Sequence, residues 1–296
     1  MSAPDPTRPT HPPLTPLEDV ARALGLDARP EDVTLSGITL DSRRVRPGDL
    51  YAALPGSRAH GATFARQAAD AGAVAVLTDV EGARLAEPAG LAVLVVEQPR
   101  SVLGDVAALV YGRPAEALRT IGVTGTQGKT TVTRLLDGGL LAAGVRSAAI
   151  GTVGTRIAGE DVATVLTTPE APDLHALFAR MLELQVTACA MEVSSHALVM
   201  GRVDGVVFDV AVFTNLGRDH LDFHADVEDY FQAKALLFTP EHARRGLVNV
   251  DDEHGRRLVA EAGVPVRTFG VDRDADWTAR DVEAAAGGST FTIHGP

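Results

Sequence analysis

The chain has 296 residues, of which 45% are hydrophobic and 22% are charged, a composition typical of a globular protein with room for two domains. Its formal net charge is −12 and no basic block interrupts this balance, which argues against a nucleic-acid partner. A single cysteine, Cys189, excludes an intramolecular disulfide and fits a reducing cytoplasm, and no apolar run is long enough to span a membrane.

The first part of the chain predicts a proline-rich disordered tail, residues 1–16, followed by a mixed α/β domain, residues 17–113. Thr15-Pro16-Leu17-Glu18 is typical of a capping box that opens a helix to about Leu26. Further strands and helices of this domain are expected at Gly37–Leu40, Leu50–Leu54, Phe64–Ala71, Val74–Leu77, Ala92–Val96 and Ser101–Tyr111. Gly112-Arg113-Pro114 then breaks the pattern and marks a boundary.

The second domain, residues 114–296, alternates apolar strands with helices. Strands are expected at Arg119–Thr124, Ser147–Thr152, Thr187–Glu192, Val206–Thr214, Leu247–Asn249 and Val266–Phe269, and helices at Lys129–Ala143, Pro172–Leu184, Val227–Phe238 and Glu253–Ala262. This alternation predicts an α/β domain with a doubly wound, mainly parallel sheet. A last strand, Ser289–Ile293, lies close to the end of the sequence, so we expect this domain to be incomplete.

A glycine-rich loop joins the first strand and helix of this second domain. Its residues predict a nucleotide-phosphate site and are Gly125, Thr126, Gln127, Gly128, Lys129, Thr130 and Thr131. Backbone N–H groups and the helix N-terminus attract phosphate, Lys129 adds a charge, and the Thr130 hydroxyl is a candidate Mg²⁺ ligand. Val123 stands where the common phosphate loop has its first glycine, which speaks against an ordinary kinase or GTPase.

Three more residues are candidates for the same site. Glu192 ends a predicted strand, where an acid can hold Mg²⁺, although such an acid can also simply face solvent. His220 follows a predicted strand and is a candidate ligand or a structural histidine, whereas His224 receives no role. Lys234 lies in an apolar helix and either reaches solvent or is buried, and a buried amine that loses its proton can react with CO₂.

These motifs resemble the Mur ligase family, most closely its MurE branch, the UDP-N-acetylmuramoyl-tripeptide synthetases. The resemblance covers nearly all of residues 17–296, and its most specific segments are Thr124–Thr131, Thr167–Pro169, Met191–His196 and Phe213–Asp222. In the first domain, Asp41–Arg43 and Pro47–Leu50 are similar to the uridine-nucleotide region of that branch.

The resemblance implies roles for single residues. Residues 125–131 bind ATP, with Asn249 as a further nucleotide contact. Thr130 and Glu192 serve one Mg²⁺, and Glu192, His220 and carbamylated Lys234 (N6-carboxylysine) serve a second. Lys129, Glu192, His220 and Lys234 form the catalytic set. Ser42 binds the uridine part of the substrate, and Thr167, Thr168, Ser194 and Arg202 bind its muramoyl-dipeptide part.

The implied reaction forms an amide bond in cell-wall synthesis. The substrate is UDP-MurNAc-L-Ala-D-Glu, ATP activates its D-Glu carboxylate as an acyl phosphate, and the amine of a diamino acid displaces phosphate. The family's third domain, which carries the pocket for that amino acid, has no counterpart here, so we expect this monomeric, cytoplasmic chain to be inactive alone. Meso-diaminopimelate, L-lysine and L-ornithine all remain open.

Other functions remain open as well. A MurF, cyanophycin or folylpolyglutamate type of ligase shares the superfamily motifs, and a phosphate-loop kinase or NTPase shares the loop. The chain could also act as a non-catalytic fragment that binds only a UDP-substrate or a nucleotide.

Overall fold

A computed structural model of the chain describes residues 5–26, 32–217 and 223–296. The chain divides into two compact units, described separately below. The first comprises Met1–Leu118, Pro169–Val186 and Gly201–Gly205, and the second comprises Arg119–Thr168, Thr187–Met200 and Val206–Pro296. This division differs from the predicted domains 17–113 and 114–296, because the segments around residues 169–186 and 201–205 pack with the first unit.

The first unit is built on a parallel sheet. Its strands are β1 (Thr15–Pro16), β2 (Thr34–Leu35), β3 (Gly37–Thr39), β4 (Asp49–Ala52), β5 (Ala75–Thr78) and β6 (Ala92–Val95). Its helices are α1 (Leu17–Ala23), α2 (Ala65–Asp70), α3 (Val80–Ala86), α4 (Leu103–Val110) and α6 (Ala171–Glu183), with short 3₁₀ turns η1 (Gly61–Phe64), η2 (Glu87–Ala89) and η3 (Pro114–Ala117). Strands β3, β4, β5 and β6 pair in this order, all parallel, and β1 pairs with β2.

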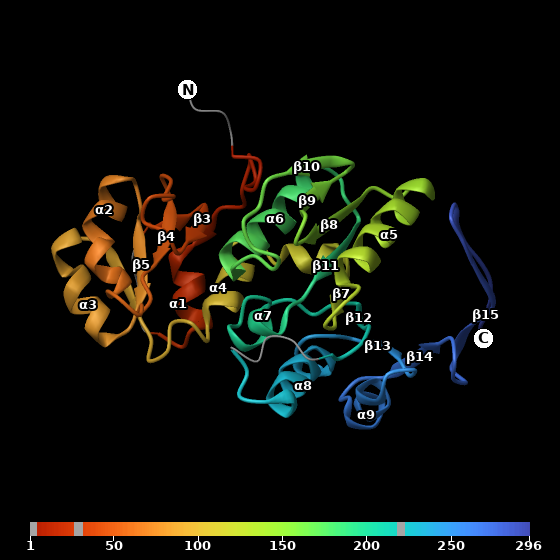
Figure 1. The fold of residues 1–296 in the computed structure, drawn as a ribbon. Helices are drawn as coiled ribbons and strands as arrows, with labels where there is room; N and C mark the ends of the chain where they lie inside the picture. Colours follow the sequence, from red (N-terminus) through yellow and green to blue (C-terminus); the bar gives the residue numbers. More distant parts are fainter. Residues whose placement is uncertain (1–4, 27–31, 218–222) are drawn as a thin grey trace. The chain divides into compact units, whose positions relative to one another are not determined.

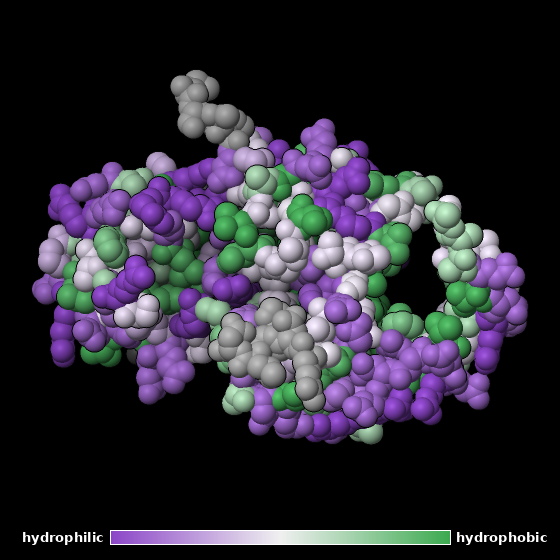
Figure 2. Space-filling model, viewed as in Figure 1, coloured by the Kyte–Doolittle hydropathy of each residue, from purple (hydrophilic) through white to green (hydrophobic). Residues whose placement is uncertain are grey.

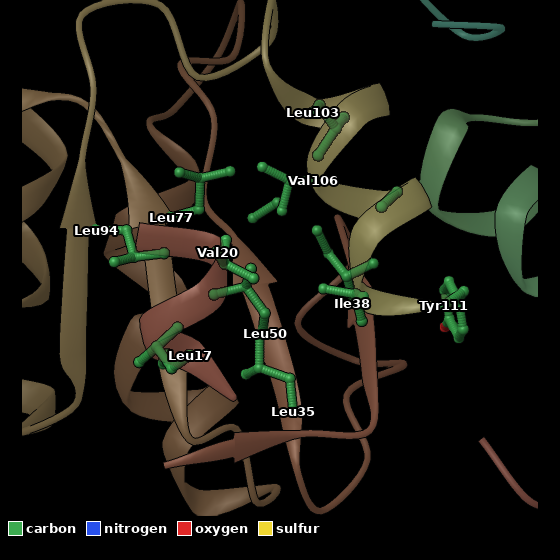
Figure 3. Close-up of a cluster of buried hydrophobic side chains, with 14 of the residues drawn as sticks. Leu17, Val20, Leu35, Ile38, Leu50, Leu77, Leu94, Leu103, Val106 and Tyr111 are labelled. Atoms are coloured by element: carbon green, nitrogen blue, oxygen red, sulfur yellow. The ribbon is translucent and has the colours of Figure 1, made fainter. Parts of the chain in front are cut away.

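Aliphatic side chains from α1, the sheet and α4 form the core of the first unit (Figure 3). Leu17, Leu50 and Leu77 are fully buried in this core, and Ala176 and Ala179 of α6 join it. Burial of this apolar surface is the main force that holds the layers together. It also explains why α6, predicted as part of the second domain, belongs to the first unit.

Residues 5–16 correct the predicted disordered tail. Arg8 is buried and forms a two-pronged ion pair with Asp49, and the backbone N–H groups of Thr10 and His11 donate to the Glu183 carboxylate. The capping box is also wrong, because Thr15 donates its hydroxyl to the Val110 carbonyl oxygen (3.1 Å) and caps nothing on α1. These contacts are distant in sequence, so local composition could not reveal them.

The second unit contains the larger sheet. Its strands are β7 (Arg119–Thr124), β8 (Ser147–Gly151), β9 (Gly154–Ile157), β10 (Glu160–Val162), β11 (Ala188–Glu192), β12 (Val210–Phe213), β13 (Gly246–Asn249), β14 (Val266–Gly270), β15 (Trp277–Ala285) and β16 (Gly288–His294). Its helices are α5 (Lys129–Ala142), α7 (Ser195–Val199), α8 (Val227–Ala235), followed by the 3₁₀ turn η4 (Leu236–Phe238), and α9 (Glu253–Glu261).

Strand order in this sheet is β10-β9-β8-β11-β7-β12-β13-β14-β15-β16. The pairs from β8 to β15 are parallel, which confirms the predicted doubly wound, mainly parallel sheet. The chain leaves β7 through α5 toward β8, but leaves β12 through α8 in the opposite direction toward β13 (Figure 1). The carboxyl ends of β7 and β12 therefore flank a topological switch point, where open α/β sheets bind their ligands.

The last two strands form a hairpin that pairs with the sheet only near its base. Trp277 and Thr278 of β15 lie opposite Phe269 and Gly270 of β14, and the hairpin beyond Ala279 is exposed. Figure 2 shows apolar surface on this hairpin. In the described part of the chain, no helix combines the length and apolar character needed to cross a bilayer.

Candidate nucleotide and substrate site

The loop between β7 and α5 requires its two glycines. Gly125 has φ +144°, and a Cβ atom there would collide with the Thr214 hydroxyl. Gly128 has φ +84° and directly precedes Lys129, the first residue of α5. Glycine adopts such angles without steric cost, and the first turn of α5 leaves backbone N–H groups directed out of the helix. The loop thus has the strand–loop–helix geometry predicted for phosphate binding.

The end of β12 holds this loop in place. The Asn215 carbonyl and side-chain oxygens accept hydrogen bonds from the backbone N–H groups of Thr126 and Gln127, each at 2.9 Å. The Thr214 hydroxyl donates to the Gln127 carbonyl oxygen (2.7 Å). Asn249, at the end of β13, donates its amide to the Thr214 carbonyl oxygen (2.9 Å), so it touches the loop's support rather than the loop.

The sequence contains only two lysines, Lys129 and Lys234, and both lie at this loop. The Lys129 ammonium donates to the carbonyl oxygens of Gly125 (2.8 Å) and Thr126 (3.0 Å). The Lys234 ammonium, on α8, donates to the same Gly125 oxygen (3.1 Å). Apart from the histidines, the other basic residues are all arginines, so both lysine ammonium groups of the chain lie at this loop, and such point charges suit phosphate oxygens.

Lys234 is buried, with 1% of its surface exposed, so it does not reach solvent. Its ammonium lies 4.3 Å from the centre of the Tyr230 ring, a cation–π contact. The Tyr230 hydroxyl in turn lies 3.2 Å from the Thr126 hydroxyl, which ties α8 to the loop a second time.

Glu192 is a buried carboxylate at the end of β11, 1% exposed. It accepts hydrogen bonds from the Thr130 hydroxyl (2.8 Å) and from the backbone N–H (2.8 Å) and hydroxyl (3.2 Å) of Thr152. Gly151 leaves room for it, because a Cβ at that position would collide with the carboxylate. All these donors are neutral, and no Lys, Arg or His of the described residues forms an ion pair with Glu192.

Across residues 5–26, 32–217 and 223–296, no three His, Cys, Asp or Glu side chains gather as ligands for a metal ion. Thr130 and Glu192 are adjacent oxygen donors, the type that Mg²⁺ prefers, and bound phosphates and waters ordinarily complete its octahedron. His220, the third predicted ligand, lies outside the described residues.

The predicted dipeptide residues of this unit are linked to Glu192. Thr167 and Thr152 share a hydroxyl–hydroxyl hydrogen bond (3.1 Å). The Thr168 hydroxyl donates to the Glu192 carbonyl oxygen (2.9 Å) and accepts from the Ser194 backbone N–H (3.3 Å). Three of the four predicted dipeptide contacts therefore lie beside the end of β11.

Ser42 and Arg202 belong to the first unit. The Ser42 hydroxyl donates to the Gln67 side chain (3.1 Å), and the Arg202 guanidinium lies 2.9 Å from the Glu170 carboxylate. Arg100 reaches the same carboxylate (3.2 Å), so Glu170 holds two arginines.

Thr152, Thr214 and Tyr230 were not predicted from the sequence, although each forms a hydrogen bond with the loop or with Glu192. Thr152 and Thr214 each end a predicted strand, and that position was the available signal. Tyr230 had no local signal, because its partner Thr126 is 104 residues away.

Comparison with known protein families agrees with this geometry. The family model described as the Mur ligase middle domain matches residues 123–296, and the Mur ligase family catalytic domain model matches residues 34–111. This chain belongs to the Mur ligase family. Within the family, it is 58% identical to the UDP-N-acetylmuramoyl-L-alanyl-D-glutamate–2,6-diaminopimelate ligase of Streptomyces avermitilis and 56% identical to that of Streptomyces coelicolor. Both matches cover all of this Mur ligase chain and 59% of the relative.

Solved structures show the same fold. A structure of UDP-N-acetylmuramoyl-L-alanyl-D-glutamate–2,6-diaminopimelate ligase superimposes with a TM-score of 0.77 at 30% identity, over 91% of this Mur ligase chain and 55% of that chain. The MurF ligase of Thermotoga maritima in complex with ADP gives a TM-score of 0.58 at 20% identity, over 88% and 56% of the two chains, a likeness of fold alone.

Proposed function

We propose that this chain forms the UDP-substrate and ATP-binding parts of a ligase that adds a diamino acid to UDP-MurNAc-L-Ala-D-Glu. The observation that carries the proposal is the meeting of the glycine loop, both lysines and buried Glu192 at one switch point. The diamino acid we propose is 2,6-diaminopimelate, because the names of both Streptomyces relatives specify it. The chain spans 59% of the length of these relatives, so the proposal concerns its part of the activity.

The proposed nucleotide is ATP, bound by residues 125–131. Backbone N–H groups at the start of α5 and the Lys129 ammonium would bind its phosphates. In the structure Lys129 rests on loop carbonyl oxygens, and the long side chain can exchange these for phosphate oxygens. Asn249, through Thr214, would hold the loop that contacts the nucleotide.

The oxygen donors fit Mg²⁺. Thr130 and Glu192 would hold one ion, and Glu192, His220 and a carbamylated Lys234 a second. Bound Mg²⁺ would supply positive charge beside the transferring phosphoryl group. Lys129 would add to that charge and reduce the repulsion between two anions, the D-Glu carboxylate and the γ-phosphate. The carboxylate could then take the γ-phosphoryl group as an acyl phosphate, with ADP as the leaving group.

The remaining residues would orient the acceptor. Thr167, Thr168 and Ser194 present hydroxyl and amide groups next to Glu192, where they can bind the muramoyl-dipeptide part and direct its carboxylate. Ser42 would bind the uridine part, and Arg202, held by Glu170, an anionic group of the substrate.

Nucleotide binding tests this proposal. Calorimetric titration of the 296-residue chain with Mg²⁺ and AMP-PNP should show binding, and Lys129→Ala should weaken it about 100-fold, because a charged contact to phosphate is lost. Arg66→Ala removes the same charge from an exposed pair on the first unit and should leave the affinity unchanged. Equal affinity of Lys129→Ala and the parent chain would refute the assignment. Binding of UDP-MurNAc-L-Ala-D-Glu, titrated separately, tests the acceptor.

A second experiment tests carbamylation. Two ammonium groups at one carbonyl oxygen repel each other, which favours conversion of one to an anion. With ¹³C-bicarbonate, we expect a lysine carbamate resonance that persists in Lys129→Arg and disappears in Lys234→Ala. Because the chain has only two lysines, a resonance with this behaviour comes from Lys234, whereas a carbamate on the α-amino group would remain in both variants. In a complete ligase, small added carboxylates should take the place of the carbamate and restore nucleotide-dependent activity to the Lys234→Ala variant. Failure of this rescue in a folded variant would count against a carbamate ligand.

A further inference from the structure

Three side chains of the second unit that the proposed chemistry does not use form a hydrogen-bonded chain. His224 places Nε2 2.9 Å from the Ser195 hydroxyl and Nδ1 3.0 Å from the Asp229 carboxylate. Ser195 is 1% exposed and His224 2% exposed, while the Asp229 side chain is about half exposed. These hydrogen-bonded side chains thus lead from the protein surface to the first residue of α7.

The hydrogen-bond chemistry fixes the direction of this chain. The Asp229 carboxylate only accepts, and it also receives the Ala225 backbone N–H (3.2 Å). The hydrogen bond from His224, followed by that from Ala225, holds the pKa of Asp229 below its usual value. The tautomer of His224 that satisfies both hydrogen bonds carries its proton on Nδ1, and its Nε2 then accepts a hydrogen bond from the Ser195 hydroxyl.

This order of groups is that of a nucleophile-activating triad, but burial decides against that role. Because Ser195 is only 1% exposed, a substrate carbonyl cannot reach its hydroxyl. The hydrogen bond between His224 and Ser195 instead fixes the position of Ser195. Ser195 directly follows Ser194 at the start of α7. Ser194 caps α7 by accepting the Ala197 N–H (3.1 Å), and its own N–H donates to Thr168.

The His224 ring also faces the nucleotide side of the site. Its centre lies 5.0 Å from that of Tyr230, whose hydroxyl contacts Thr126 of the glycine loop. Phe223 packs on the same ring (4.9 Å) and against His196 (3.8 Å). His224 therefore stands between α7, with its proposed substrate contact, and α8, which carries Lys234.

We propose that His224 is a positioning residue that, through Ser195, holds Ser194 and the start of α7 in the geometry that binds UDP-MurNAc-L-Ala-D-Glu. The inference rests on the proposed function, since it gives this substrate to the site. The hydrogen bond to Ser195 is the element that matters, and Asp229 orients the ring that makes it.

Asparagine and glutamine separate the two hydrogen bonds of the ring. The amide of His224→Gln can occupy the place of Nε2 and keep Ser195, whereas that of His224→Asn can occupy the place of Nδ1 and keep Asp229. Calorimetry on the 296-residue chain measures the Kd of UDP-MurNAc-L-Ala-D-Glu and, separately, that of Mg²⁺ with AMP-PNP. We expect Ser195→Ala and His224→Asn to raise the Kd of the UDP-substrate about tenfold and that of the nucleotide less than twofold. His224→Gln should stay within about threefold of the parent chain.

A double variant completes the test. If Ser195→Ala and His224→Asn act through one bond, the double variant binds the UDP-substrate no more weakly than either single variant. Additive losses, a parallel rise of both Kd values, or a Kd for His224→Gln as poor as for His224→Asn would each overturn the positioning role. Failure of the parent chain to bind the UDP-substrate would instead refute the proposed function, and this inference with it.

Discussion

The two units bury charge in opposite ways. In the first unit, the Arg8 guanidinium and the Asp49 carboxylate satisfy each other, and the Tyr111 hydroxyl completes the group. In the second unit, the carboxylate of Glu192 is equally buried but is surrounded by neutral donors. The first arrangement is complete within the protein, whereas the second keeps a negative charge that a bound cation can match.

Under the proposed function, this difference separates a structural from a functional use of buried charge. Removing one partner of a complete pair leaves the other charge isolated and should cost stability. Removing a buried charge that no opposite charge balances should instead leave the stability unchanged or raise it, and should weaken ligand binding. Two predictions test whether the two sites separate in this way, and a third concerns a buried histidine of the first unit.

The largest effect should come from Asp49→Ala, which leaves Arg8 as a buried, unpaired cation. We expect the free energy of unfolding of the first unit to fall by about 3–5 kcal/mol. Hydrogen exchange of its core peptides, read by mass spectrometry, measures this, while the affinity for Mg²⁺ and AMP-PNP should not change. Asp70→Ala breaks the exposed Arg66–Asp70 pair and should cost less than about 1 kcal/mol. A loss no greater than that of this control would contradict the comparison.

His175 should give the first unit its pH dependence. It is fully buried on α6, and burial lowers its pKa from 6.5 to about 4. Its Nε2 pairs with the Asp204 carbonyl oxygen (3.1 Å), and its Nδ1 has no hydrogen-bond partner among the described residues. Between pH 6.5 and 4 the unfolded chain takes up a proton at this side chain that the folded chain does not.

The contribution of neutral His175 to stability should therefore be complete above pH 6.5. As the pH falls toward 4, the free energy of unfolding should decrease by about 3 kcal/mol. Urea unfolding at several pH values, monitored by hydrogen exchange of peptides of the first unit, gives the slope of the free energy of unfolding against pH. His175→Phe, which cannot take up the proton, should flatten it. If the parent chain and His175→Phe gave the same slope, the pH dependence would come from a group other than His175.

The smallest effect should come from Glu192→Gln. The amide keeps the shape and can still accept from Thr130 and Thr152 but carries no charge. We expect the melting temperature to stay or rise, and the Mg²⁺-dependent part of the AMP-PNP affinity to fall about tenfold. Calorimetry with and without Mg²⁺ gives that part. A clear drop in melting temperature, with Mg²⁺-dependent binding intact, would make Glu192 a structural residue like Asp49.

Much of the second unit could be predicted because its signals are local. Strand β7, the loop Gly125–Gly128 and helix α5 lie within residues 119–142, and glycine spacing alone locates the loop. Glu192 was predicted from its place at the end of an apolar strand, since parallel strands present such residues at one edge. The burial of Lys234 was one of two predicted outcomes, and the structure decides for it.

The errors came from contacts distant along the chain. Residues 5–16 have the composition of a tail, yet Arg8 meets Asp49 41 residues later. Helix α6 lies between strands of the second unit in the sequence, and only its packing assigns it to the first unit. His224 received no role, because its partner Ser195 lies 29 residues earlier.

By itself, the sequence determined the alternation of strands and helices and the place of the glycine loop, because hydrophobic periodicity and the backbone freedom of glycine act over a few residues. Only the tertiary structure decided which polar groups meet: both lysines at the Gly125 carbonyl oxygen, Thr130 at Glu192, and His224 at Ser195. Such pairings depend on how strands order within a sheet, and strand order is a property of the whole chain.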